Sequence, residues 1–198
     1  MKTNTTIAKL VLGIAPWMAT GLANAAITFE DAAVSIGVSA NALQSNGFVF
    51  STGALHGIQT RADLGASNGS HYLTYLASGS ETFSALSNTA FNLSSLDLGG
   101  WFNFGTASQF LTLTGYQTNG SSVSATLQVA PNAFQTYALT GFTNLHHVRL
   151  GRVDRSPSYV AIDNLVTTPV PEPEAFAMLL LGLGVLGALQ RKKRGAGA

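Results

Sequence analysis

The sequence has 198 residues with no cysteine and a formal net charge of +1, and the lack of cysteine excludes disulfides, thiol catalysis and thiolate metal sites. All four lysines lie near the ends, at positions 2, 9, 192 and 193, so residues 26–169 keep seven acids against four arginines, a net charge of −3. A domain with this balance and no basic stripe offers little to a phosphate backbone, so we expect no nucleic acid partner.

The first 25 residues have the pattern of a secretory signal peptide. Lys2 and Lys9 precede an apolar run from Leu10 to Leu22, which is followed by the small-x-small sequence Ala23-Asn24-Ala25. This order of charge, apolar run and cleavage pattern predicts export by the secretion machinery. We expect the mature chain to begin at Ala26.

Residues 26–166 are expected to form one all-β domain. Short runs of β-branched, aromatic and other apolar residues alternate with Gly, Asn and Ser, and no stretch has a 3.6-residue period long enough for a helix. About ten short strands at spacings near ten residues favour an antiparallel jelly-roll sandwich. The predicted strands are Ile27–Phe29, Phe48–Ser51, His71–Ala77, Glu81–Leu86, Phe91–Asp97, Phe110–Tyr116, Val123–Val129, Phe134–Leu139, Leu145–Leu150 and Tyr159–Val166.

Two further expectations concern the loops and the core of this domain. Gly37–Gly69 is the least periodic segment, and we expect long loops there. Most aromatic side chains of a sandwich are core residues. The expected core phenylalanines are Phe83, Phe91, Phe104, Phe110, Phe134 and Phe142.

The C-terminal segments have the pattern of a tether. Residues 167–174 contain three prolines and are expected to form an extended linker that exposes Pro171, Glu172 and Pro173. Residues 175–190 are expected to form a single transmembrane helix, although the apolar stretch would reach only about 22 Å against a hydrocarbon core of about 30 Å. Residues 191–198 form a basic tail that would stay in the cytoplasm under the positive-inside rule. The basic residues are Arg191, Lys192, Lys193 and Arg194.

This order of triad, short apolar helix and terminal basic cluster resembles the PEP-CTERM sorting signal of Gram-negative bacteria. The resemblance implies that an exosortase-like membrane protease recognises the triad. The precursor would be held transiently in the inner membrane, with its domain in the periplasm, before transfer to the cell surface or the medium. Proteins with this signal are associated with exopolysaccharide and the biofilm matrix, which implies a non-catalytic structural or polysaccharide-binding role.

The first and last segments of the domain carry a second resemblance. Ile27–Asp31 and Ala161–Val166 resemble the first and last strands of jelly-roll carbohydrate-binding and galactose-binding-like modules. In that group an acid of the opening segment and an aspartate of the closing strand can hold a structural calcium ion. The resemblance implies Glu30 or Asp31, together with Asp163, as ligands, with backbone carbonyls supplying further oxygens. The alternative is that Asp31 and Asp163 cap turns and Glu30 is solvated.

Four aromatic residues are candidates for stacking on a sugar ring. Trp101 and Phe102 follow Gly99-Gly100, and Tyr116 and Tyr159 lie in predicted strands. A flat indole face matches the C–H face of a pyranose, so Trp101 is the candidate glycan contact.

No catalytic residues stand out from the sequence. The alternative function, a small secreted hydrolase or glycosidase, would need two carboxylates about 5 to 10 Å apart in a cleft, and the scattered acids do not indicate one. The adjacent His146 and His147 would point to opposite faces of a strand, which argues against their binding one metal together. We therefore expect a protein that is not an enzyme.

Overall fold

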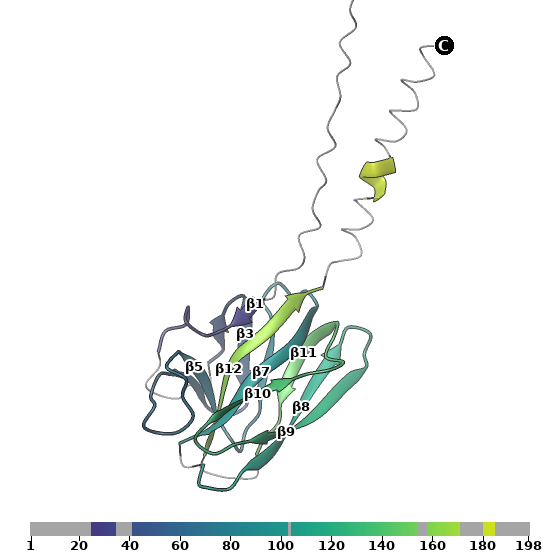
Figure 1. Ribbon diagram of the computed structural model, residues 1–198. Coiled ribbons are helices and arrows are strands. Elements are labelled where there is room, and N and C mark those ends of the chain that lie inside the picture. Colours follow the sequence, from purple (N-terminus) through teal and green to yellow (C-terminus); the bar gives the residue numbers. More distant parts are fainter. Residues whose placement is uncertain (1–24, 35–40, 103, 154–157, 171–179, 185–198) are drawn as a thin grey trace, which may run out of the picture.

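The computed structural model describes residues 25–34, 41–102, 104–153, 158–170 and 180–184 of the chain. Twelve strands are found within these ranges (Figure 1). They are β1 (Ala25–Ile27), β2 (Leu43–Ser45), β3 (Phe48–Thr52), β4 (His56–Gln59), β5 (Tyr72–Leu76), β6 (Glu81–Ala85), β7 (Phe91–Trp101), β8 (Gln109–Gln117), β9 (Ser122–Val129), β10 (Phe134–Ala138), β11 (Leu145–Leu150) and β12 (Tyr159–Pro169).

The strands pair antiparallel and form the two layers of a jelly-roll sandwich, as the sequence predicts. One layer has the order β2-β3-β6-β11-β8-β9. The other has the order β4-β5-β12-β7-β10, with β1 pairing along β12 beyond the end of β5. A single pair, Leu145 with Phe91, connects the two layers where β11 and β7 begin.

The least periodic segment contains more strand than expected. The short strands β2 and β4 both lie within Gly37–Gly69, where we predicted long loops. β2 has three residues and β4 has four, and all four residues of β4 are buried. Strands this short, or buried on both faces, show no alternation of apolar and polar residues, so the sequence pattern does not reveal them.

The core between the layers contains most of the expected phenylalanines. Phe83, Phe91, Phe104 and Phe142 are buried there, as predicted. Phe110 is 62% exposed, and that prediction is wrong. Leu111 and Leu113 of β8 point into the core, and because successive side chains alternate, Phe110 faces solvent.

The two ends of the domain lie together. Ala25 of β1 pairs with Thr167 of β12, and both strands reach the same end of the sandwich (Figure 1). β12 continues to Pro169, which pairs with Phe91, so residues 167–169 extend the strand rather than open the linker. The last strand is therefore three residues longer than predicted.

The terminal segments are described only in part. Among the described residues no helix is long and apolar enough to cross a membrane. Residues 180–184, within the expected transmembrane helix, are helical. Residues 1–24, the triad at 171–173 and the basic cluster at 191–194 lie outside the described ranges.

Candidate functional site

The outer face of the sheet β5-β12-β7-β10 carries a second, smaller apolar cluster. Leu96 and Leu98 of β7 point into the main core, so alternation turns Asp97, Gly99 and Trp101 to the outer face. The side chains of this cluster are Leu64, Ala66, Tyr72, Trp101, Phe134, Tyr159 and Ala161. Phe134, which we predicted in the core, belongs to this outer cluster and is only partly buried.

The loop between β4 and β5 packs against the end of β7 on this face. The backbone N–H of Ala66 donates to the carbonyl of Gly100 at 3.0 Å, and the N–H of Phe102 donates to the carbonyl of Leu64 at 2.8 Å. Gly65 forms an isolated bridge with Trp101. The loop thus behaves as an extra layer over the end of β7.

The indole of Trp101 is buried within this cluster and does not present an exposed face to solvent. Its side chain is only 6% exposed, and its Nε1 donates to the carbonyl of Arg61 at 3.5 Å. The indole meets Tyr159 edge-on at 5.8 Å between ring centroids and lies 5.9 Å from the ring of Phe102. The expected flat, exposed indole is therefore not present, because the β4–β5 loop covers it.

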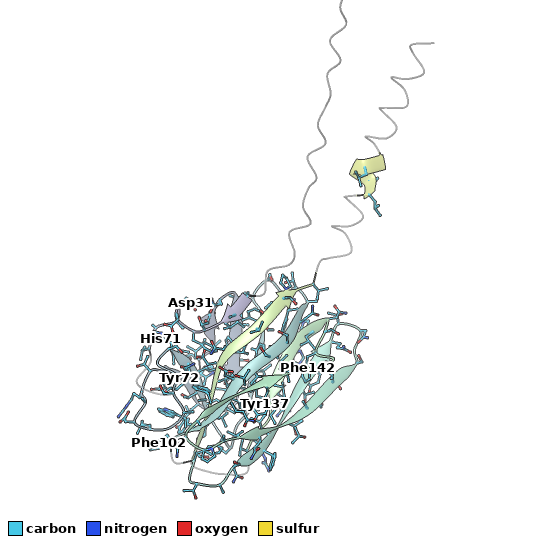
Figure 2. All side chains as sticks on the ribbon, viewed as in Figure 1. Asp31, His71, Tyr72, Phe102, Tyr137 and Phe142 are labelled. Atoms are coloured by element: carbon cyan, nitrogen blue, oxygen red, sulfur yellow. The ribbon has the colours of Figure 1, made fainter. Side chains whose placement is uncertain are left out.

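Phe102 is the exposed aromatic ring of the group. It is 43% exposed, and its centroid lies 6.2 Å from that of the half-buried Tyr159. Its backbone φ of +26° lies in a region that L-residues rarely adopt, and such conformations gather at functional sites. Phe102 lies at the end of the domain opposite to the end where β12 stops (Figure 2).

A polar pair lies beside this aromatic group. Arg61 donates to both carboxylate oxygens of Asp63, from Nε at 3.1 Å and from Nη2 at 2.7 Å. This hydrogen bonding lowers the pKa of Asp63, so the pair is charged at neutral pH. The Arg61 carbonyl also accepts hydrogen bonds from Trp101 and from the hydroxyl of Tyr72. The pair is consequently attached to the aromatic cluster through its own backbone.

Of the acids predicted to hold calcium, Asp31 is engaged in a turn instead. Both carboxylate oxygens of Asp31 cap the β2–β3 turn, by accepting from the hydroxyl of Ser45 at 2.6 Å and the N–H of Asn46 at 2.8 Å. These bonds lower the pKa of Asp31. Across the described ranges, no group of three His, Cys, Asp or Glu residues is placed to hold a metal ion.

Glu30 and Asp163 lie on either side of one short segment. Glu30 accepts a hydrogen bond from the N–H of His71 at 2.9 Å, and Asp163 accepts one from the hydroxyl of Ser70 at 2.9 Å. Asp163 is fully buried and also accepts from Asn68 at 2.7 Å. Burial raises the pKa of Asp163, while these hydrogen bonds act to lower it.

The sheet also places two carboxylates opposite each other, which the sequence did not reveal. Asp97 of β7 is the cross-strand partner of Asp163 in β12. The oxygens of Asp97 accept from Thr136 at 2.6 Å and from the side chain of Asn164 at 2.8 Å. Since every oxygen of both carboxylates accepts a hydrogen bond from the protein, the pair is built as a structural network.

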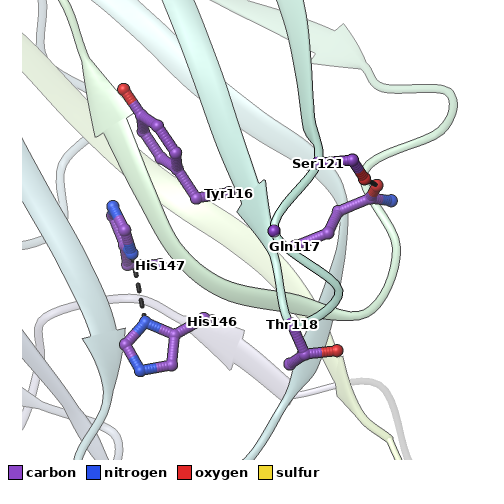
Figure 3. A pocket seen from close by; sticks show the side chains of 7 residues that line it. Tyr116, Gln117, Thr118, Ser121, His146 and His147 are labelled. Carbon is purple, nitrogen blue, oxygen red and sulfur yellow. Dashed lines mark hydrogen bonds between the residues drawn. The ribbon is translucent and has the colours of Figure 1, made fainter.

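A pocket on the other layer is lined by the rings of Tyr116, His146 and His147. It has a volume of about 350 Å³ and lies between the β8–β9 turn and β11 (Figure 3). His147 stacks on Tyr116 with centroids 4.3 Å apart, and the Nδ1 atoms of His146 and His147 are 3.1 Å apart. Burial and the neighbouring His146 lower the pKa of His147. The prediction that the two histidines point apart is wrong, because the pairing with β8 shifts register between Leu145 and His147.

Comparison with known proteins identifies the terminal segment. Residues 169–194 match the PEP-CTERM protein-sorting motif. A search of curated proteins finds no match.

Solved structures that resemble the chain include several from polysaccharide-degrading systems. An exo-β-agarase matches at 12% identity and a TM-score of 0.48, over 76% of this chain and 26% of its own. The xylan-binding domain of carbohydrate-binding module family 22 matches at 16% identity and a TM-score of 0.42, over 73% of this chain and 93% of its own. A family 29 carbohydrate-binding module matches at 10% identity and a TM-score of 0.44, over 74% and 91%.

The chain spans about a quarter of the agarase, and similarities at this level leave its function to be argued from its own residues. The chain therefore carries a PEP-CTERM protein-sorting motif at residues 169–194, after an antiparallel jelly-roll domain.

Proposed function

We propose that this chain is an exported, non-catalytic glycan-binding protein of the extracellular matrix that an exosortase-like protease processes at Pro171-Glu172-Pro173. The signal peptide pattern and the sorting motif support export and a transient stay in the inner membrane. The domain would lie in the periplasm at first and at the cell surface or in the medium afterwards.

The observation that carries the glycan-binding part is the exposed ring of Phe102, held beside Tyr159 by the buried Trp101. An exposed aromatic ring matches the apolar C–H face of a pyranose. Arg61 and Asp63 offer charged donors and acceptors to sugar hydroxyls at the rim. Phe102 also lies at the opposite end of the domain from the end of β12, which the sorting motif follows in the sequence, so a long polysaccharide could reach it while the chain is still anchored.

The second candidate function is a glycosidase, and among the described residues it is favoured only by Asp97 and Asp163. Catalysis would need an acid that can exchange a proton with a substrate and a second carboxylate that reaches it. Asp163 is fully buried, and its oxygens are taken by Asn68, Ser70 and the N–H of Asn164. The proposal of a binding protein therefore stands, and release of reducing sugar that Asp97→Asn abolishes would contradict it.

The test of glycan binding compares two exposed phenylalanines. We expect Phe102→Ala to weaken retardation in affinity gels containing acidic or neutral polysaccharides by about tenfold in Kd, which corresponds to about 1.4 kcal/mol of lost stacking. Phe110→Ala is the matched control, because Phe110 is still more exposed but lies on β8 in the other layer. Equal binding by both variants would contradict the site, and no retardation of the native protein by any glycan would favour a structural role.

A structural calcium ion remains part of the proposal, for Glu30 and Asp163 only, and Asp163 would have to exchange hydrogen bonds from Asn68, Ser70 or Asn164 for the ion. Calcium takes six to eight oxygens, so backbone carbonyls and water would complete the site. We expect EDTA to lower the melting temperature and added Ca²⁺ to restore it, in the native protein and in Asp31→Asn, but not in Asp163→Asn. A native protein whose melting temperature ignores EDTA would count against the ion.

A further inference from the structure

The strand β11 contains one residue too many for its pairing with β8. Leu145 pairs with Gln117 and His147 pairs with Tyr116, so two residues of β11 span one step of β8 and His146 is the extra residue. Such a bulge breaks the alternation of side chains. The bulge brings the rings of His146 and His147 close together. In a regular strand, alternation would place these two side chains on opposite faces of the sheet.

The two imidazoles then present the same kind of atom to each other. Their Nδ1 atoms share a hydrogen bond at 3.1 Å, and the ring planes are nearly perpendicular, at 85°. With metal–nitrogen bonds of about 2.0 to 2.1 Å, two nitrogens at right angles around one ion would lie about 2.9 Å apart, and two at a tetrahedral angle about 3.4 Å apart. The observed separation lies between these values, so an ion that takes the place of the shared proton needs little change in the distance between the two nitrogens.

The surroundings suit a cation. The pocket is lined by Tyr116, Gln117, Thr118, Gly120, Ser121 and the two histidines, none of which is a lysine or arginine. Stacking on Tyr116 fixes the ring of His147, while His146 is exposed and accessible from solvent (Figure 3). The volume of about 350 Å³ leaves room for water molecules to fill the remaining coordination positions.

We infer that His146 and His147 form a surface binding site for a divalent late first-row metal, with Cu²⁺ bound most tightly. Imidazole nitrogen suits copper, nickel and zinc, and affinity for a given nitrogen site is greatest for Cu²⁺. A tetragonal Cu²⁺ ion takes adjacent ligands at right angles, which the bulge places close to the required separation. This site is independent of the proposed glycan contact at Phe102, which lies on the other layer.

The test is a Cu²⁺ titration of the full chain in detergent, by calorimetry with glycine as a competing chelator, followed by electron paramagnetic resonance. We expect one site with nitrogen hyperfine structure from two imidazoles. Loss of a supporting group around a metal typically costs 10–100-fold in affinity, so loss of a direct ligand in His146→Ala should cost at least about tenfold. His71→Ala is the control, because His71 lies far along the chain from the pair and stays half-buried beside Glu30.

His146→Ala is the decisive variant, since its exposed ring can be removed without opening the core. His147→Ala should have the same effect on Cu²⁺ affinity, and circular dichroism checks that its fold is unchanged. The inference is overturned if His146→Ala binds Cu²⁺ as the native chain does, or if His71→Ala loses as much affinity. Because no glycan is present, failure here leaves the proposed glycan contact untouched.

Discussion

His56 and Glu81 form a buried ion pair that links the two layers of the sandwich. His56 lies in β4 and Glu81 begins β6, and neither side chain is exposed. Nδ1 of His56 is 3.0 Å from the Glu81 carboxylate, and Nε2 is 2.5 Å from the carbonyl of Asn41. Burial acts to lower the pKa of His56, but the hydrogen bond to Glu81, its negative charge and the Asn41 carbonyl together raise it. Burial raises the pKa of Glu81 as well.

These directions predict that stability falls as pH rises above about 6.5. The folded state holds the His56 proton more tightly than the unfolded chain does, so this stabilisation is complete below the ordinary pKa of 6.5 and is lost as pH rises through the folded pKa. Urea unfolding of the native protein at several pH values between 6 and 9 measures the slope. His147, whose pKa is lowered, contributes a slope of opposite sign.

The double variant His56→Gln, Glu81→Gln is the control for this slope, because it removes both charges while keeping polar side chains. The difference between the two proteins isolates the pair, since His147 is common to both. An identical pH dependence would refute the assignment. Glu81→Ala alone should cost about 3 to 5 kcal/mol, because it leaves the buried His56 without the partner of its Nδ1.

Among the elements, β7 can pack closely against its neighbours only because Gly99 has no side chain. A Cβ there would lie 2.5 Å from the carbonyl oxygen of Ala133 and 2.6 Å from the Cβ of Ala66, in the β4–β5 loop. We expect Gly99→Ala to destabilise the domain by about 1 to 3 kcal/mol, as overpacking of a tight interior does. Thermal unfolding checks this, with Gly53→Ala as the control, because a Cβ at Gly53 meets nothing within 4 Å. Equal melting temperatures would show that the loop does not pack closely on β7.

Most of the fold could be predicted from the alternation of apolar and polar residues within the long strands. In β7 the sequence Leu96-Asp97-Leu98 distinguishes the core face from the outer face without any knowledge of its neighbours. The burial of Trp101 by the β4–β5 loop could not be predicted from alternation. It depends on Gly65 and Ala66, more than thirty residues earlier, which lie in a loop rich in small residues that has no period.

The same limit applies to the candidate metal site and to the acid pair. His146 and His147 are adjacent in sequence, but which way their rings point is set by the register with Tyr116 and Gln117 in another strand. Asp97 and Asp163 become neighbours only through the pairing of β7 with β12. Register between distant strands is a property of the whole sheet, and a local pattern does not contain it.

For the molecule as a whole, the triad at residues 171–173 should decide where the protein ends up. With Pro171, Glu172 and Pro173 replaced by alanine, we expect the unprocessed chain to remain in the inner membrane, because the protease would no longer recognise it. Fractionation and intact mass from envelope and medium measure this, with the exposed Phe110→Ala as a processed control. Normal release of the alanine variant would contradict the proposed processing.

The order in which the strands are made has a consequence for export. β12 lies in the middle of its layer, between β7 and the pair β5 and β1, yet it leaves the ribosome after all of them. Until it emerges, the earlier strands lack the partner that joins them, and pairing over such sequence distances is slow. We therefore expect the nascent polypeptide to stay loose enough to be threaded through a translocation channel and to close into its final shape on the far side.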